Sequence, residues 1–288
     1  MNSFLNPYTV DKSRPVDPVT LQILSVVNRV ASELELPYIV VGATARDLLL
    51  FHVFGIPVTR ATADVDFAVA MDSWERFREL RAALLTSGHF RKEKMEHRVY
   101  LKAPSVKDEI PVDLIPFGGV AEADAIHWPP DRETVMAVVG FEDAIAAAVH
   151  VQVDTDLTIP TASLAGIAVL KLFAWHDRQT NGKDALDLYR VISSYADAGN
   201  FDRLYNEEVR FLEQADHDME FAGAALLGFD ARQLCNPGTL ARVRDILTNP
   251  DFAERLAERV RLSRWPLQPE RLQRILSVLL KFTDQLSG

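Results

Sequence analysis

The sequence predicts a mixed α/β fold of the α+β class, in which a mixed β-sheet flanked by helices precedes an all-helical region. Two observations lead to this prediction. Short β-branched runs interleave with helical patterns over about the first 120 residues, whereas nearly every segment after Thr161 repeats its apolar residues at helical spacing. The change of pattern near residue 160 predicts two domains, residues 1–160 and residues 161–288, and a chain of 288 residues is long enough for both.

The first expected element is a helix over residues 17–34, where Asp17 is the candidate N-cap and Pro18 takes the first helical position. The run YIVVG at 38–42 is typical of a buried strand, and ARDLLLFHVF then returns to helical periodicity. The same criteria predict the remaining N-terminal elements: strands at 65–70, 98–103, 110–117, 150–153 and 157–160, and helices at 72–85 and 141–149.

The C-terminal region is predicted to consist of helices alone. They are expected at residues 161–178, 182–196, 201–214, 218–229, 239–247, 251–262 and 269–286.

The composition limits the class of protein. A single cysteine, Cys235, excludes an internal disulfide and a cysteine-based zinc cluster, and it fits a reducing compartment, so we expect the cytoplasm. No segment approaches the roughly 18 consecutive apolar residues of a membrane span, and the N-terminus lacks a signal-peptide core.

The net charge of −10 opposes broad binding to duplex nucleic acid, because such binding needs many cations against the phosphates. Residues 72–107 nevertheless hold nine Lys or Arg against five Asp or Glu. This segment is either a solvated face or a local patch that steers a polyanion.

Three carboxylates are candidate metal ligands. Asp64 and Asp66 are one residue apart on a predicted strand, so their side chains share a face, where like charges repel unless a cation lies between them. Oxygen ligands of this kind suit Mg²⁺. Asp113 lies in the otherwise apolar strand IPVDLIPF, where an ionised carboxylate needs a partner. The alternatives are two solvated loop carboxylates and, for Asp113, a structural salt bridge.

The turn Gly42-Ala43-Thr44 is a candidate phosphate site. It joins a predicted strand to a helix N-terminus, where free backbone N–H groups and the helix dipole favour an anion. By itself, such a feature is more often an ordinary strand-to-helix turn. Beside the carboxylates, it supplies what phosphoryl or nucleotidyl transfer requires, a phosphate cradle next to metal ligands.

A glycine turn, a helix, the pair Asp64 and Asp66 on a strand, and Asp113 on a later strand follow one another along the chain. This order of motifs resembles the DNA polymerase β-type nucleotidyltransferase superfamily. GATARDLLL is similar to the G-G-x-V-R-D-L-L-L stretch of tRNA CCA-adding enzymes and bacterial poly(A) polymerases. VLKLFAWHDRQTNGKDALDLYRVI is similar to the K…R…K-D…D block of the AbiEii/AbiGii toxin-like nucleotidyltransferases. The resemblance covers roughly residues 38–195.

The resemblance implies a Mg²⁺-dependent enzyme that transfers a nucleoside monophosphate from a nucleoside triphosphate (NTP) to an acceptor hydroxyl. It implies an RNA or tRNA end as acceptor, a cognate antitoxin as a partner, and a helical domain that completes the nucleotide cleft. Two Mg²⁺ ions and the NTP would then be held by the following residues. Asp64, Asp66 and Asp113 would bind the metals, Gly42, Ala43 and Thr44 the β and γ phosphates, and Lys171 and Asp184 the nucleotide.

The sequence departs from the superfamily at Ala43, where Gly or Ser is usual, so a serine hydroxyl contact to phosphate is missing unless Thr44 supplies it. Other acceptors stay open, namely a protein side chain or a small molecule such as an aminoglycoside. A non-catalytic nucleotide-binding protein is a further alternative. Trp128 is interpreted as a loop anchor, with base stacking as the other possibility.

Overall fold

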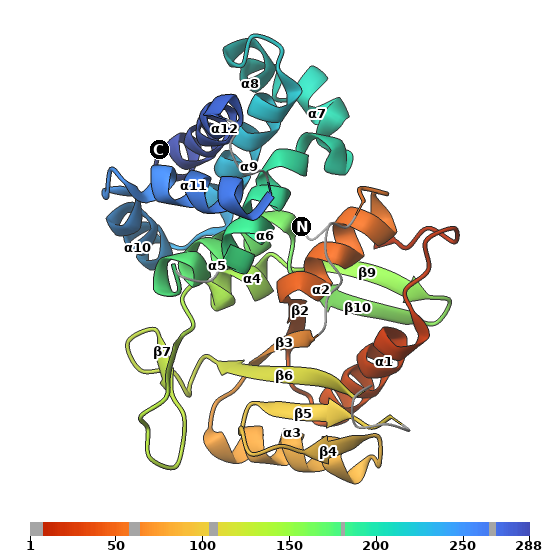
Figure 1. Ribbon diagram of the computed structural model, residues 1–288. Helices are drawn as coiled ribbons and strands as arrows, with labels where there is room; N and C mark the ends of the chain where they lie inside the picture. The colour runs from red at the N-terminus through yellow and green to blue at the C-terminus, as the bar shows by residue number, and fades with distance from the viewer. Residues whose placement is uncertain (1–7, 58–63, 104–108, 180–181, 265–268) are drawn as a thin grey trace. The chain divides into compact units, whose positions relative to one another are not determined.

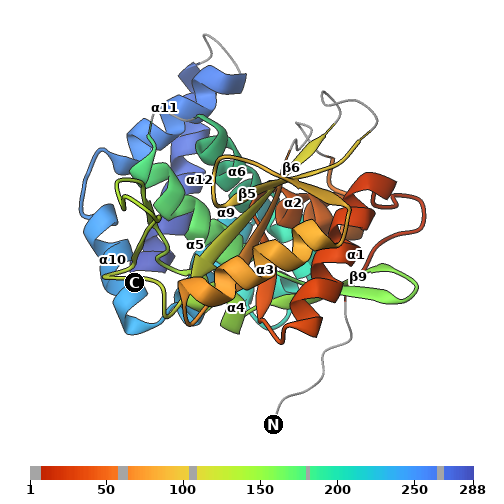
Figure 2. The same cartoon turned by 90° about the horizontal axis from the view of Figure 1, so that it is seen from below.

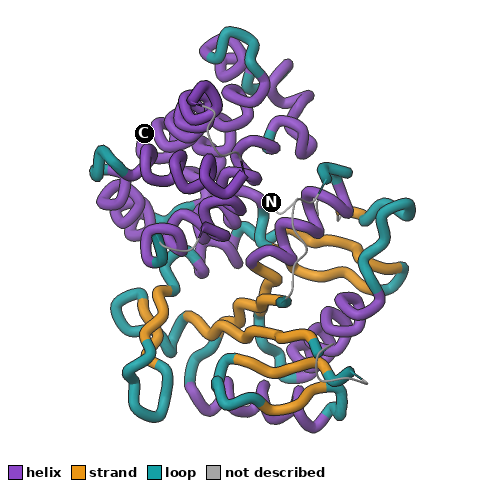
Figure 3. The backbone as a smooth tube through the Cα atoms, in the orientation of Figure 1, coloured by secondary structure: helices purple, strands orange, loops and turns teal. Residues whose placement is uncertain are grey.

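The computed structural model describes residues 8–57, 64–103, 109–179, 182–264 and 269–288. The chain divides into two compact units, Met1–Ser163 and Leu164–Gly288, which are described separately below. Figure 3 shows that the strands gather in the first unit and that the second is helical. Among the described residues, no helix combines the length and apolar character that crossing a membrane requires.

The first unit is built on an eight-stranded mixed sheet with the strand order β1-β9-β10-β2-β3-β6-β5-β4 (Figure 1). At its centre β3 runs parallel to β6 and antiparallel to β2. The strands of this sheet are β1 (Tyr8–Thr9), β2 (Tyr38–Val41), β3 (Val65–Ala70), β4 (Phe90–Lys92), β5 (Arg98–Leu101), β6 (Ile110–Phe117), β9 (Val149–Asp154) and β10 (Leu157–Thr161). A separate ribbon pairs β7 (Ala125–His127) with β8 (Val135–Ala137).

One face of this sheet is apolar and carries the core. Phe67 of β3 and its register partner Leu114 of β6 lie on this apolar face, and both are fully buried. Alternate residues of each strand point to the opposite face. Helices α1 (Pro18–Glu33) and α3 (Trp74–Thr86) lie side by side against it (Figure 2). Tyr38 of β2, on the same face, contacts the Phe67 ring and donates a hydrogen bond to Asn28 of α1 at 2.7 Å.

Most predicted elements of this unit are confirmed. Asp17 caps α1 through its side chain, Ser73 caps α3, and β3 and β6 have the predicted bounds. The helix expected from residue 45 instead begins directly at the turn, as α2 (Gly42–Asp47), and continues as the π-helix η1 (Leu48–Val53). The expected helix at 141–149 is α4 (Phe141–Ala146).

The second unit contains α5 (Leu164–Asp177), α6 (Gly182–Ser194), the π-helical turn η3 (Ala196–Asn200), α7 (Phe201–Tyr205), α8 (Val209–Gln214), α9 (Met219–Leu234), α10 (Pro237–Leu247), α11 (Phe252–Arg264) and α12 (Pro269–Ser287). Helices α9 and α12 approach closely, because a Cβ on Gly228 would lie 2.2 Å from the Phe282 carbonyl oxygen.

The prediction of a single helix at 201–214 is wrong, because the structure has two short helices, α7 and α8, in its place. Phe201, Tyr205 and Val209 have the spacing of a helical stripe, but they are 51%, 52% and 40% exposed. A helix gains most of its stability by burying such a stripe, so an exposed one does not hold a continuous helix together.

Candidate metal centre and glycine turn

Three carboxylates, from β3, from β6 and from the residue directly before β3, converge on the face of the sheet opposite the core. Asp66 of β3 and Asp113 of β6 are direct register partners, and Asp64 lies two residues before Asp66. Each of the three offers one oxygen, and these oxygens lie within 4.8 Å of one another. All three residues are half-buried. The structure therefore places Asp64 and Asp66 together, as sequence periodicity predicted, and adds Asp113 to them.

Gly42 lies directly against this cluster. Its φ of +68° is in the left-handed region, and a Cβ at this position would come within 2.2 Å of Asp66 Oδ2. Only glycine adopts this conformation without strain and leaves room for the carboxylate. The glycine turn and the metal-ligand candidates are thus neighbours in space.

The Thr44 hydroxyl is turned toward the protein. Thr44 Oγ1 donates a hydrogen bond to the Asp64 carbonyl oxygen at 3.1 Å, and both Thr44 and Ala43 are buried. This bond ties the start of α2 to the residue that precedes β3. The first backbone N–H groups of a helix have no intrahelical partner, so they are the remaining donors that the turn offers to an anion.

Arg98 is a site residue that the sequence reasoning did not single out. It stands opposite Asp113 in the β5–β6 register, where Nε and Nη2 donate to Oδ1 and Oδ2 of Asp113, both at 2.6 Å. Hydrogen bonding to Asp113 raises the pKa of Arg98 although partial burial opposes it. The salt bridge considered as an alternative for Asp113 is therefore present. A cation opposite Asp113 becomes visible only when the pairing of the two strands is known.

The cluster fits a hard divalent cation. Three carboxylates and one guanidinium leave a formal charge of −2, and carboxylate oxygens are the ligands that Mg²⁺ and Mn²⁺ prefer. A carboxylate has about four lone-pair sites, so the bidentate contact with Arg98 does not use all of those on Asp113.

In the second unit, Lys171 bridges two buried aspartates. Its Nζ lies 2.9 Å from Asp184 Oδ1 and 2.8 Å from Asp187 Oδ2, so the ion pairs join α5 to α6. Burial disfavours the charged lysine, but the charges of Asp187 and Asp184 outweigh it and raise the pKa of Lys171. Asp184 Oδ2 makes an ion-pair contact of 3.0 Å with Arg178 Nη2, without hydrogen-bond geometry.

Trp128 is a buried anchor. It is 4% exposed and packs against the rings of Trp74, Phe77 and His97. Burial lowers the pKa of His97, against the opposing charge of Asp113. A ring enclosed in this way is closed to a nucleobase.

The arginines of the basic segment 72–107 are largely neutralised. Four of them pair with glutamates and one with Asp113; these are Arg76, Arg78, Arg81, Arg91 and Arg98. Lys107 lies outside the described residues. This pairing favours the interpretation as a solvated face.

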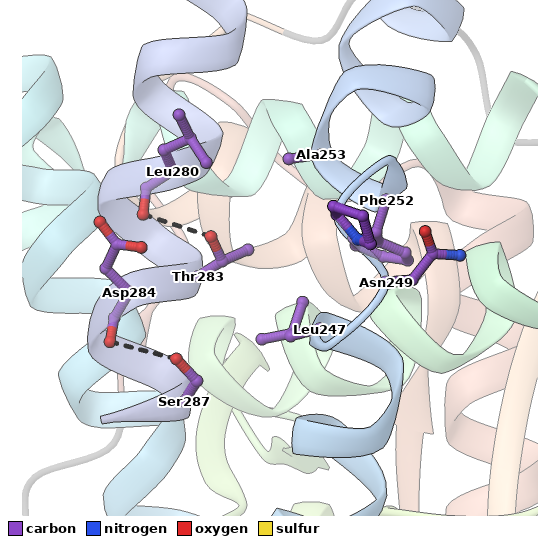
Figure 4. A pocket seen from close by; sticks show the side chains of 9 residues that line it. Leu247, Asn249, Phe252, Ala253, Leu280, Thr283, Asp284 and Ser287 are labelled. Atoms are coloured by element: carbon purple, nitrogen blue, oxygen red, sulfur yellow. Dashed lines mark hydrogen bonds between the residues drawn. The ribbon is translucent and has the colours of Figure 1, made fainter.

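A pocket of about 210 Å³ lies in the second unit, between α12 and the segment that joins α10 to α11 (Figure 4). Its polar rim is occupied by internal bonds, since Thr283 donates to the Leu280 carbonyl and Ser287 to the Asp284 carbonyl. None of the residues predicted to bind metal or nucleotide lines it.

Comparisons with known proteins identify one family. The family model "Nucleotidyl transferase AbiEii toxin, Type IV TA system" matches residues 25–272. Among proteins with curated descriptions, none matches this sequence.

Several solved structures overlap partly with the chain. An antigenic nucleotidyltransferase-like protein from Paracoccidioides brasiliensis is 16% identical, with a TM-score of 0.42 over 70% of this chain and 94% of that chain. The antibiotic-resistance factor ANT(2'')-Ia is 16% identical, with a TM-score of 0.39 over 70% and 99% of the two chains. A CCA-adding enzyme with ATP is 15% identical, with a TM-score of 0.32 over 95% and 80%.

Proposed function

This chain belongs to the AbiEii family of nucleotidyl transferases, and we propose that the cluster of Asp64, Asp66 and Asp113 is its catalytic centre. The reaction is the transfer of a nucleoside monophosphate from an NTP to an acceptor hydroxyl. One observation carries the proposal: three carboxylates that can hold a metal stand in contact with a glycine turn, through Gly42 and Asp66.

The proposed chemistry assigns a role to each carboxylate. Asp64, Asp66 and Asp113 hold divalent cations, for which we propose two Mg²⁺ ions. Such ions, when bound, stabilise negative charge on the attacking and leaving oxygens. The acceptor hydroxyl oxygen forms a bond to the α-phosphorus, the bond to the β-phosphate oxygen breaks, and pyrophosphate leaves with that electron pair. A carboxylate oxygen of Asp113 takes the hydroxyl proton.

The turn is proposed to hold the β and γ phosphates through its backbone. Since the Thr44 hydroxyl hydrogen is engaged by the Asp64 carbonyl, Gly42, Ala43 and Thr44 contribute N–H groups. Backbone donors do not depend on the side chain, so Ala43 in place of Gly or Ser leaves them intact.

For the nucleotide we also propose contacts from Lys171 and Asp184 of the second unit. The raised pKa of Lys171 keeps the ammonium charged at neutral pH, as neutralising a triphosphate requires. Its ion pairs with two aspartates also make it a structural link between α5 and α6.

We propose an RNA or tRNA end as the acceptor, and a cognate antitoxin as a partner. The description of the matched family as a toxin of a type IV toxin–antitoxin system supports the antitoxin. The RNA or tRNA end is proposed from the resemblance of the sequence to the toxin-like nucleotidyltransferases. The arginines of the basic segment 72–107 are ion-paired as a solvated face, so the proposed acceptor contacts are not assigned to them. A protein side chain or a small molecule is the alternative acceptor.

The test incubates the protein with each α-³²P-labelled NTP, Mg²⁺ and total RNA. Parallel reactions offer protein or aminoglycoside acceptors. The wild type is compared with Asp66→Asn, which removes a charge at constant shape, and with the double variant Asp64→Ala, Asp66→Ala. Asp156→Asn is the matched control, because Asp156 is an exposed carboxylate in the turn between β9 and β10.

We expect label on RNA with the wild type and the Asp156 variant, and none with the other two. Label on another acceptor would reassign the substrate but keep the chemistry. If Asp66→Asn transfers label as well as the wild type does, the carboxylate cluster takes no part in catalysis. Absence of transfer to every acceptor, with NTP binding unchanged, would overturn the enzymatic proposal.

A further inference from the structure

Arg98 forms an ion pair with Asp113, the same carboxylate that the proposed chemistry uses as a metal ligand. Its guanidinium spans Asp113 in the two-point geometry that makes arginine–carboxylate pairs strong, with both distances at 2.6 Å. The pair is held in place by the strand register, since Arg98 and Asp113 face each other across β5 and β6. Asp113 in turn faces Asp66 across β6 and β3. A cation therefore ends a row of carboxylates that runs across the sheet.

A divalent cation and the Arg98 guanidinium repel each other at Asp113. A divalent ion bound to Asp113 would lie next to a guanidinium whose nitrogens are 2.6 Å from both carboxylate oxygens. Arginine stays charged at all accessible pH values, so it cannot yield by losing a proton. It can yield only by moving. The Arg98 side chain is 24% exposed, which leaves the guanidinium a route toward solvent.

We propose that Arg98 is a built-in counter-cation of the carboxylate cluster, which competes with the metal for Asp113. Without metal, it stabilises three converging carboxylates by reducing their charge from −3 to −2. When a metal binds, Arg98 releases Asp113. The competition keeps the affinity of the empty cluster for a free cation low, so the cation is taken up together with the negatively charged triphosphate. This inference rests on the proposed function in taking the cluster as a cation site.

A purely structural arginine would have the opposite effect on metal binding. If Arg98 only oriented Asp113 as a ligand, its removal would leave that carboxylate less ordered and would weaken metal affinity. If Arg98 competes, its removal strengthens metal affinity. The sign of the change therefore separates the two roles.

The experiment measures Mn²⁺ binding to the full chain without nucleotide, by electron paramagnetic resonance of free Mn²⁺ and by calorimetry. Arg98→Gln removes the charge, and Arg98→Lys keeps the charge but loses the two-point contact. Arg91→Gln is the matched control. Arg91 lies on the neighbouring strand β4 and pairs with the buried Glu109 side chain at 2.5 Å, so its removal also takes a guanidinium away from a buried carboxylate.

We expect Arg98→Gln to bind Mn²⁺ about tenfold more tightly than the wild type, because it removes one full charge beside a divalent ion. Arg98→Lys should lie between the two, and Arg91→Gln should match the wild type. Without metal, Arg98→Gln should melt at a lower temperature than the wild type. Addition of Mn²⁺ should raise the melting temperature of the variant more than that of the wild type. If Arg98→Gln does not fold, Arg98→Lys still decides the sign.

The inference would be overturned if the wild type binds Mn²⁺ measurably and the Arg98 variants bind it equally or more weakly. That result would leave the proposed function standing. The failure of the proposed function looks different. In that case neither the wild type nor the Arg98 variants bind Mn²⁺, or Asp66→Asn binds it as well as the wild type does.

Discussion

Replacing Gly42 by alanine tests whether the glycine turn and the carboxylates form one site. The substitution has two costs. A non-glycine residue at φ +68° is strained by roughly 1–2 kcal/mol. In addition, the new Cβ would lie 2.2 Å from Asp66 Oδ2, far inside ordinary contact distance, so the carboxylate has to retreat by about 1 Å.

Gly88→Ala separates these costs. Gly88 has a φ of +81°, and a Cβ there would meet nothing within 4 Å, so this variant carries the backbone strain alone. We expect it to lose roughly 1–2 kcal/mol of unfolding free energy and to keep its activity. Gly42→Ala should lose about 1–3 kcal/mol more from overpacking, and on the order of 100-fold in nucleotidyl transfer from the displaced ligand.

The assays are urea unfolding, Mn²⁺ binding and transfer of labelled nucleotide, each on the two variants and the wild type. The reasoning is refuted if Gly42→Ala matches Gly88→Ala in stability while its Mn²⁺ affinity and transfer rate equal those of the wild type. That result would mean that the Asp66 carboxylate has free space beside the turn, and that contact with Gly42 does not set its position.

Three further predictions follow from single contacts. Lys171→Met should lower the unfolding free energy by about 3 kcal/mol in urea titrations, because it breaks the ion pairs of Lys171 with the buried Asp184 and Asp187, although Asp184 keeps its contact with Arg178. Thr44→Val should cost roughly 1 kcal/mol by the loss of the hydrogen bond to the Asp64 carbonyl, and should keep nucleotide affinity in calorimetry if the backbone of the turn binds the phosphates. Tyr38→Phe should cost about 1 kcal/mol at pH 7, where the phenol donates to Asn28. Burial raises the pKa of Tyr38 above its unfolded value of about 10, so the stability contributed by the neutral phenol is present below that pH and is lost above it. The difference in unfolding free energy between Tyr38→Phe and the wild type should therefore shrink as the pH rises past about 10.

Local pattern was sufficient for the central strands and for the carboxylates they carry. Strands β3 and β6 were predicted with their observed bounds, because a long apolar run with turn residues on both sides is compatible with few other secondary structures. Period two then placed Asp64 and Asp66 on one face. The edge strands β1 and β4 were missed, since two or three residues are too short to show alternation.

Contacts between elements could not be read from the sequence. The Arg98–Asp113 pair depends on the register of two strands, and neither strand's own pattern contains that register. The resemblance named Lys171 but could not show that its side chain meets Asp187 of the next helix. The direction of the Thr44 hydroxyl is set by a residue twenty positions later, the Asp64 carbonyl.

The two ends of the described sheet bear on how the protein behaves at high concentration. A sheet edge exposes unpaired backbone groups that can recruit a strand from another molecule, and proteins avoid this with short edge strands and charged side chains. Here one edge is β1, which has two residues, and the other is β4, whose three residues Phe90–Lys92 include two cations. The sheet is thus poorly suited to templating fibrils, and substituting valine for Lys92 is the change we expect to make it aggregate.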